Sequence, residues 1–599
     1  MVRRLAWTFG LLLVLAIPLA PPAGGAPASG PAIMRLSEIR PGMRGVGRTV
    51  VSGQRPQDYA FEVMDVLQTG GGPVGVDRLI MVRVSGPLME RTGGTAAGMS
   101  GSPMYINGRL IGAHSAGFVW RVPSSDIALV TPIQDMLKVL DRRPAGAAAQ
   151  PAIYHATRPF VLAGRRYGSV AVAPTAGAAA RLAAQLPGVA VAAPAVAVYA
   201  RGLSPRAYRL LSDLVEPRGF ELLQGHGGRG DFAAEPIVAG SSIGIQDVRG
   251  DIEFGGICTV TIRVGDRILA CGHPWENAGD VEYVMTASEV VTVVRALPRN
   301  FKIGNLGAII GVIDQDRPGA IAGTLGRYPR LFNLRVVVTD QDAGTRTEVG
   351  AQLVRRRDMA RLFAPLVALS AVERARNQAG GEGTAITKLT LRARGLPRPI
   401  VRENTFFSTQ DVATASVLDI VDAMELAFYN DLRVLEPVDL TVEVVLTKKR
   451  NTASIVEVQT DAREVTPGGT LRVRVALQPY LAERPEVRVV EVPVPRDFPR
   501  GPAFLVVRSA GVDAPNVPVQ AQLGQTLAVE PTPWGVDSLE TALRLFENFA
   551  KNTDLLVRIQ PFGLPATGQD FTRFDVPAAR TARTEWVIQG VERLPILIR

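Results

Sequence analysis

The sequence predicts a mainly β protein with some helices, made of two β-barrel units and a C-terminal β-sandwich. Short apolar runs separated by glycine turns fill residues 33–142 and again residues 236–354, which is typical of barrels. Residues 438–510 alternate apolar and polar side chains, as small sandwiches do. The chain has 599 residues, and one domain rarely exceeds about 200, so several domains are expected.

The N-terminus, residues 1–28, has the features of a signal peptide. Arg3 and Arg4 supply positive charge, an apolar stretch follows at residues 5–19, and the small residues 23–28 offer a cleavage site. The apolar stretch is short for a membrane span. We therefore expect export with cleavage, with a membrane anchor as the alternative, and an extracytoplasmic location (periplasmic, secreted or in the cell envelope).

The first β unit, residues 33–142, carries its strands in apolar runs between glycines. These runs are residues 61–67, 79–84, 103–106, 110–113 and 127–130. Residues 143–235 are rich in Ala and Pro, so we expect a connector with one helix at residues 204–214. Strand-like runs resume in the second β unit, residues 236–354.

The rest of the chain is predicted as three smaller parts. Residues 355–437 form a helical α+β segment, residues 438–510 a β-sandwich-like module, and residues 511–599 a small C-terminal α+β segment. The expected helices and the last strand are residues 357–378, 413–429, 538–549 and 554–559.

Composition excludes several classes of protein. The net charge is +10, but 60 of the 66 basic residues are Arg and they are mostly scattered, unlike the patches that bind nucleic acid. Two cysteines are too few for a disulfide scaffold or a Cys-rich zinc module. No His, Cys, Asp and Glu cluster has metal-ligand spacing, and no phosphate-binding loop occurs. We therefore expect no metal, no cofactor and no nucleic-acid partner.

The motif that carries chemistry is Gly-Met-Ser-Gly-Ser-Pro at residues 98–103. A serine between glycines, followed by a strand and the turn Asn107-Gly108, suits the nucleophile loop of a chymotrypsin-like protease. The glycines allow a tight turn, in which the amides of Gly98 and Ser100 can converge as an oxyanion hole. A Gly/Ser turn without catalytic duty is the alternative interpretation.

A serine nucleophile needs a base, and the chain has only four histidines. His273 follows a predicted strand and precedes Pro274, so its backbone is held firmly, as a general base requires. A hydrogen-bonded turn histidine is the alternative. His114 is expected to be a packed wall residue beside the Ser100 loop, and His155 and His226 are expected to be solvated in the connector.

Residues 93–103, followed by residues 108–112, resemble the SpoIVB-type serine peptidases, which are exported chymotrypsin-like proteases. The resemblance extends to residues 42–45, to the Gly-His-Pro turn at 272–274 and to residues 311–323. It covers most of residues 33–330 and implies two chymotrypsin-like β-barrel units. Carried over residue by residue, it implies Ser100 as the nucleophile and His273 as the general base.

The sequence departs from the sporulation members of that family in two respects. Their His barrel precedes their Ser barrel, whereas here Ser100 precedes His273, so the two units are expected in permuted order. Triads are defined by geometry and occur in several chain orders. Those members also carry an acid fifteen positions before the nucleophile, where this sequence has Ser85.

The group that orients His273 is left open by the sequence. Asp316 lies 43 residues after His273, a separation close to that of the serine-protease template. A Ser–His dyad without an acid is the alternative. Four other aspartates compete for the role, namely Asp77, Asp251, Asp280 and Asp314.

Cys258 and Cys271 flank a predicted hairpin that turns at Gly265. Antiparallel pairing brings the two cysteines opposite each other or one step apart, which allows either a disulfide or two facing thiols. A disulfide would brace the strand that presents His273.

Together these features predict an exported serine endopeptidase that acts on a protein or peptide substrate. The first alternative is a non-catalytic extracytoplasmic scaffold, a degenerate pair of barrels that binds partners. An esterase that uses the same dyad is the second. Envelope protein partners are expected to dock on the C-terminal β module.

Overall fold

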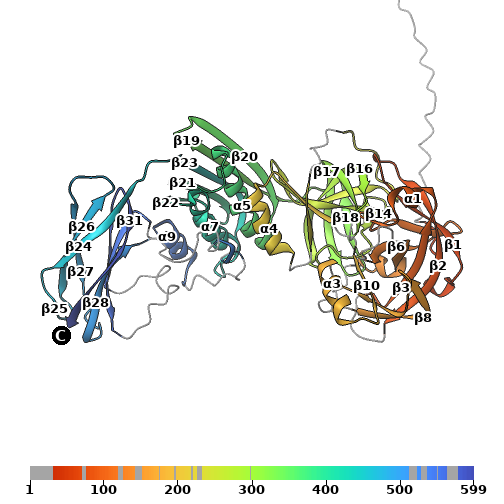
Figure 1. Cartoon of the computed structure of the whole chain (residues 1–599), viewed down its shortest axis with the longest axis horizontal. Coiled ribbons are helices and arrows are strands. Elements are labelled where there is room, and N and C mark those ends of the chain that lie inside the picture. The colour runs from red at the N-terminus through yellow and green to blue at the C-terminus, as the bar shows by residue number, and fades with distance from the viewer. Residues whose placement is uncertain are drawn as a thin grey trace, which may run out of the picture.

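The computed structural model describes residues 31–599 except for several short stretches. Those stretches are residues 70–75, 119–125, 142–151, 174–175, 195–196, 217–219, 226–231, 297–298, 511–522, 526, 528–535, 549–550 and 563–577. The predicted signal peptide and His226 therefore lie outside the described residues. The protein is mainly β, as predicted, and Figure 1 shows it as an elongated chain of three parts.

Six strands of the first β unit pair in a closed ring. They are β1 (Arg44–Thr49), β2 (Gln57–Thr69), β3 (Arg78–Ser85), β5 (Pro103–Ile106), β6 (Arg109–Phe118) and β7 (Ile127–Pro132). In ring order they run β1-β2-β3-β7-β6-β5 and back to β1. Apolar side chains such as Phe61, Val82 and Ile111 fill the inside. Closure leaves these strands few exposed edges.

The expected connector contains more regular structure than its composition indicates. Strands β8 (Ala152–Leu162), β9 (Arg165–Val172) and β10 (Ala190–Pro194) extend the first sheet, and α3 (Ala176–Gln185) packs on β10. Helix α4 (Pro205–Val215) forms where a helix was predicted, with Ser204 as its N-cap. Only β10 is itself rich in alanine and short of the residues that mark strands in sequence. β8 and β9 carry Ile, Val, Tyr and Phe, but they lie within a stretch whose overall composition is rich in Ala and Pro.

The second β unit repeats the same ring. Its strands are β13 (Ser242–Gly250), β14 (Glu253–Val264), β15 (Arg267–Ala270), β16 (Gly279–Val294), β17 (Asn300–Arg317) and β18 (Ala320–Leu325). They run β13-β14-β15-β18-β17-β16 and back to β13. In both rings the order is first, second, third, sixth, fifth and fourth strand. The chain therefore builds one barrel topology twice.

The two barrels are joined by backbone pairing as well as by packing. The short strand β4 (Ala96–Ala97), just before the Ser100 loop, pairs in parallel with the start of β17. Asn300 reinforces this junction, because its side-chain amide donates to the carbonyl of Gly93 at 2.9 Å. The nucleophile loop of the first barrel thus rests on the second.

The sheet of the second barrel continues into the middle part of the molecule. Strands β19 (Leu331–Asp340) and β20 (Thr345–Val354) pair with β13 on one side and β23 (Glu436–Thr447) on the other, followed by β21 (Gly383–Arg394) and β22 (Ile400–Ser408). Helices α5 (Arg357–Arg376), α6 (Val412–Ala415) and α7 (Leu418–Phe428) pack beside it. None of the helices in the described residues is long and apolar enough to span a bilayer.

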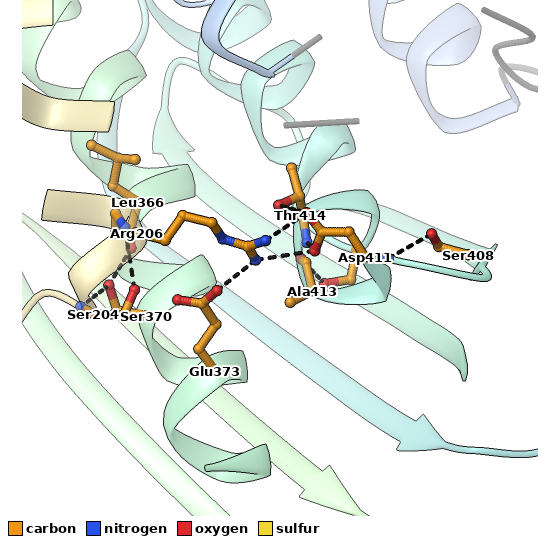
Figure 2. A network of polar contacts seen from close by, with 11 residues as sticks. Ser204, Arg206, Leu366, Ser370, Glu373, Ser408, Asp411, Ala413 and Thr414 are labelled. Carbon is orange, nitrogen blue, oxygen red and sulfur yellow. Dashed lines mark hydrogen bonds and ion pairs between the residues drawn. The ribbon is translucent and has the colours of Figure 1, made fainter. Parts of the chain in front are cut away.

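A buried ion network ties the helices of this middle part together (Figure 2). Arg206 of α4 pairs with Glu373 of α5 at 2.5 Å and with Asp411 at 2.6 Å. Asp411 also caps α6, where it accepts from the amide of Thr414. The network fixes three helices that are far apart in sequence.

The C-terminal part is a two-sheet sandwich with its own core. One sheet contains β24 (Thr452–Thr460), β26 (Thr470–Pro479), β27 (Glu486–Pro493) and β31 (Val587–Gln589). The other contains β25 (Glu464–Val465), β28 (Gly501–Ser509), β29 (Asp554–Pro561), β30 (Ala579–Arg583) and β32 (Val591–Ile598). The sandwich therefore takes in strands beyond residue 510. Helix α9 (Leu539–Asn548) leaves it and packs on the middle part.

Candidate active site

The two predicted catalytic residues occupy equivalent places in the two barrels. Ser100 lies in the connection between the third and fourth strands of the first ring, β3 and β5. His273 lies in the connection between the third and fourth strands of the second ring, β15 and β16. Because the barrels share one topology and dock on each other, these two connections meet at the interface between them.

The Ser100 loop is a tight turn held by hydrogen bonds between its own backbone groups. Gly98 and Gly101 have φ of 90° and 94°, which favours glycine. The carbonyl of Met99 accepts from the amide of Ser102 at 3.0 Å and from its hydroxyl at 2.6 Å. In a trans peptide the C=O and N–H point in opposite directions. The amide of Ser100 therefore points away from Ser102, as an oxyanion donor would.

Strand β14 of the second barrel holds this loop by three hydrogen bonds. The amide of Thr259 donates to the carbonyl of Ser100 at 2.8 Å, and its hydroxyl donates to the carbonyl of Gly98 at 3.0 Å. The hydroxyl of Thr261 donates to the carbonyl of Gly101 at 2.7 Å. A Cβ on Gly101 would lie 2.5 Å from the amide nitrogen of Cys271, so only glycine fits here.

The His273 turn is held against the first barrel from the other side. The hydroxyl of Thr131 donates to the carbonyl of Gly272 at 2.6 Å, and Gly272 lies against the backbone of Ala113 and His114. Cys271, with φ of 65°, donates its amide to the carbonyl of Thr259 at 3.2 Å. The base and the nucleophile loop are thus fixed to the same strand, β14.

His273 has the tautomer that a general base needs. Its Nδ1 lies 2.7 Å from the carbonyl of Pro274, and a carbonyl only accepts, so Nδ1 carries the proton. Nε2 then keeps its lone pair. The ring is 4% exposed, and burial lowers its pKa to about 4, so it is neutral at pH 7. Among the described residues Nε2 has no hydrogen-bond partner, Ser100 included.

His114 lies closer to the chemistry than the sequence indicates. Its backbone pairs with the loop, because Gly101 donates to its carbonyl at 2.7 Å and its own amide donates to Ser102 at 3.0 Å. The ring is buried, as expected of a wall residue, and it lies near enough to His273 for the two rings to interact electrostatically. Burial, with a smaller effect of His273, lowers its pKa to about 4. Two neutral imidazoles therefore flank the nucleophile loop.

The structure brings Asp316 to the segment that follows His273 and not to the ring itself. Its carboxylate accepts from the amides of Trp275, Glu276 and Ala278 at 2.7, 2.8 and 3.2 Å, and from the hydroxyl of Tyr283 at 3.2 Å. Burial raises its pKa, and these amides oppose that rise. Asp316 therefore holds the backbone that carries His273, while the carbonyl of Pro274 holds the ring.

Of the four competing aspartates, Asp77 is exposed and the other three are occupied elsewhere, while Ser85 lies exposed at the end of β3. Asp314 pairs with Arg267 at 2.5 Å and Asp280 with Arg317 at 2.8 Å. Asp251 accepts from the amide of Gly350 at 2.7 Å.

Cys258 and Cys271 form a disulfide with a Cα separation of 5.2 Å. Cys258 belongs to β14 and Cys271 begins the His273 turn, so the bond ties the base to the strand that holds the Ser100 loop. Among the described residues no group of three or more His, Cys, Asp or Glu side chains is arranged to hold a metal ion.

Lys302 is a residue near the site that the sequence did not single out. It is fully buried at the start of β17, and its side-chain carbons lie against Gly98. A single lysine inside an apolar strand was the available signal, in a chain with few lysines.

These features define a class of protein, a double β-barrel with a serine loop and a neutral histidine at the barrel interface. Residues 30–128 match the model of one family, SpoIVB peptidase S55. The match contains the whole Ser100 loop and confirms the predicted resemblance to the SpoIVB-type serine peptidases for that segment; it ends before His273. No curated protein and no solved structure matches the chain.

Proposed function

We propose that this protein is an extracytoplasmic serine endopeptidase that works with a Ser100–His273 dyad. The observation that carries the proposal is the tautomer of His273, whose unprotonated Nε2 belongs to a turn docked on the nucleophile loop. The family match supports peptidase chemistry for the segment that supplies Ser100.

In the proposed reaction the Ser100 oxygen attacks a peptide carbonyl while its proton passes to Nε2 of His273. The carbonyl oxygen becomes an oxyanion, which the amides of Gly98 and Ser100 stabilise. Nε2 then protonates the leaving amine as the C–N bond breaks. Water hydrolyses the acyl-enzyme by the same steps in reverse, which restores Ser100.

In this dyad the carbonyl of Pro274 takes the place of the acid of a triad. An acid normally holds the Nδ1 proton of the base and stabilises the imidazolium. A carbonyl fixes the tautomer equally well but carries no full charge, so the imidazolium is less stabilised. Asp316 does not contact the ring; its carboxylate positions the ring indirectly, by accepting hydrogen bonds from the backbone of residues 275–278.

The site is closed in this structure, because Ser100 is fully buried. A small sulfonyl fluoride is therefore the appropriate first probe. We expect phenylmethylsulfonyl fluoride to label Ser100, and Ser100→Ala and His273→Ala to abolish both labelling and casein cleavage. If the folded, mature protein is not labelled and does not cleave casein, the peptidase proposal is wrong.

One observation favours the scaffold alternative, namely that Nε2 of His273 has no hydrogen-bond partner within the described part of the chain. In a peptidase this hydrogen bond would form in the substrate complex, as catalytic hydrogen bonds often do. The scaffold predicts no labelling but intact binding of envelope proteins through the sandwich. An esterase would cleave nitrophenyl esters and leave peptides intact.

Export is supported by the buried disulfide, because disulfides persist in oxidising compartments. N-terminal sequencing of the mature protein tests it: a new N-terminus near residue 28 is expected, and Met1 would contradict cleavage.

A further inference from the structure

Lys302 is joined to the nucleophile loop by a short relay of side chains. Its ammonium donates to the hydroxyl of Thr259 at 3.3 Å and to that of Thr49 at 3.1 Å. The Thr259 hydroxyl in turn donates to the carbonyl of Gly98 at 3.0 Å. Lys302 is thus linked through Thr259 to the carbonyl of Gly98, the residue whose amide is a predicted oxyanion donor.

Backbone pairing places Lys302 directly beside Gly98. In the parallel pair of β4 and β17, Ala96 is opposite Asn300 and Ala97 is opposite Phe301, so the next residues in register are Gly98 and Lys302. A Cβ on Gly98 would lie 3.0 Å from Cδ of Lys302. The side-chain carbons of Lys302 therefore pack against Gly98 and limit the room available to the loop at this position.

The charge of Lys302 is held without a counter-ion. The side chain is fully buried, and among the described residues its nitrogen bonds to two hydroxyls and to no carboxylate. Its surroundings are the hydroxyls of Thr49 on β1 and Thr259 on β14, the Gly98 loop, and the His114 ring on β6, whose pKa it lowers. A buried cation without an anion is costly, and ionisable groups perturbed in this way cluster at functional sites.

We propose that Lys302 is a positioning residue of this site, which sets the Gly98 carbonyl through Thr259 and supplies positive charge beside the oxyanion. This rests on the proposed peptidase function. The oxyanion of the tetrahedral intermediate would be the counter-ion of the Lys302 ammonium. This negative charge exists only during the reaction. Such charge is worth most in a dry site, where screening by water is weak.

The protonation of Lys302 then controls the rate near neutral pH. Burial lowers its pKa to about 7, so the ammonium is lost as the pH rises through 7. His273 is already neutral above pH 5, because its pKa is about 4. Acylation of Ser100 should therefore be fastest between about pH 5 and 7 and decline above that range.

The experiment measures the rate at which phenylmethylsulfonyl fluoride sulfonylates Ser100, with release of fluoride, from pH 5 to 9 in the full mature protein. In Lys302→Met we expect a rate at least about tenfold lower at pH 6 and no decline above pH 7. Lys302→Arg keeps its charge at all these pH values, so its rate should not decline either. Lys388→Met, at an exposed lysine on β21, is the matched control and should behave as wild type.

A Lys302→Met protein that reacts at the wild-type rate, with the wild-type decline, would overturn this role. A wild type that does not react at all would instead refute the peptidase proposal. NMR titration of the His114 ring then still tests Lys302: its pKa should rise in Lys302→Met, and an unchanged value would contradict the inference. Thermal melting of each variant establishes that it is folded.

Discussion

At the scale of single residues, burial decides the chemistry of the site. His114 and His273 are both nearly inaccessible to solvent, and no carboxylate of the described residues bonds to either ring. Both are therefore neutral at pH 7, which suits a base that must accept a proton. Because they are buried, protonating them in the folded state costs free energy, so we expect acid to destabilise the region around these two rings.

We expect the barrels to lose stability as the pH falls from 6.5 to 4. Burial lowers both histidine pKa values from 6.5 to about 4, so the unfolded chain binds protons in this window and the folded chain does not. Each ring should contribute a loss of roughly 3 kcal/mol by pH 4. Urea unfolding at pH 7 and pH 4.5 measures it.

His114→Leu should weaken this acid dependence, because one of the two rings is removed. His155→Gln is the control, since His155 is exposed on β8, with its Nδ1 3.0 Å from the hydroxyl of Ser169. Equal acid dependence in wild type and His114→Leu would show that the buried rings are not responsible.

Gly101→Ala should be severely destabilising. A Cβ there would overlap the carbonyl of Thr259 and strain a backbone with φ of 94°. We expect a loss of about 2–5 kcal/mol in the free energy of unfolding and no labelling of Ser100. Gly108→Ala is matched to it, with φ of 73° but open space around the Cβ, and should cost about 1 kcal/mol. Thermal melting separates the two, and equal losses would show that the overlap is relieved cheaply.

At the scale of elements, the site depends on strands that serve both barrels. β14 binds the Ser100 loop through Thr259 and Thr261 and is tied by the disulfide to the His273 turn. β17 pairs with β4 at one end and carries Asp316 at the other. Two strands of the second barrel therefore align a loop of the first.

The helices of the middle part depend on the Arg206 network drawn in Figure 2. Arg206→Met would leave Glu373 and Asp411 buried without their cation, which should cost about 3–5 kcal/mol. Arg335→Met breaks the exposed pair with Glu348 and should change stability little. Guanidinium unfolding of both variants measures the difference, and equal effects would show that the buried network is not what holds these helices.

At the scale of the whole molecule, the parts share more of their hydrophobic core than the domain boundaries predicted from the sequence indicate. One continuous core runs from the second barrel through α5 and α7, and it also takes in Phe546 of α9. The sandwich has a separate core, and it is joined to the middle part by α9 and by Asn552, whose side chain donates to the carbonyl of Thr405 at 3.0 Å. Figure 1 shows this helix between the two.

Phe546→Ala should uncouple the sandwich from the middle part. The ring is 2% exposed, and its truncation should cost about 3–5 kcal/mol where α9 docks. Calorimetry should then show the sandwich unfolding in a transition of its own. Phe562→Ala removes an exposed ring and should leave the wild-type profile. An unchanged profile in Phe546→Ala would contradict the anchoring role of α9.

Much of the fold was predictable because its signals are local. The strands around Phe61 and Leu79, the helix capped by Ser204 and the long helix after Arg356 all carry periodicity or capping residues. Strand β10 was missed because it is mostly alanine, which is not enriched in strands, and β8 and β9 were missed because they lie in a stretch rich in Ala and Pro overall. Lys302 was missed because its partners come from three other segments of the chain.

The sequence by itself determined the β-rich class, the tight serine loop and the few histidines that could serve it, since each depends on neighbouring residues. Only the tertiary structure decided that the chain builds the same barrel twice, and that Pro274 rather than an aspartate holds Nδ1 of His273. Ring closure and docking join residues that are distant in sequence. Such pairings depend on how the strands pack, and no local pattern records them.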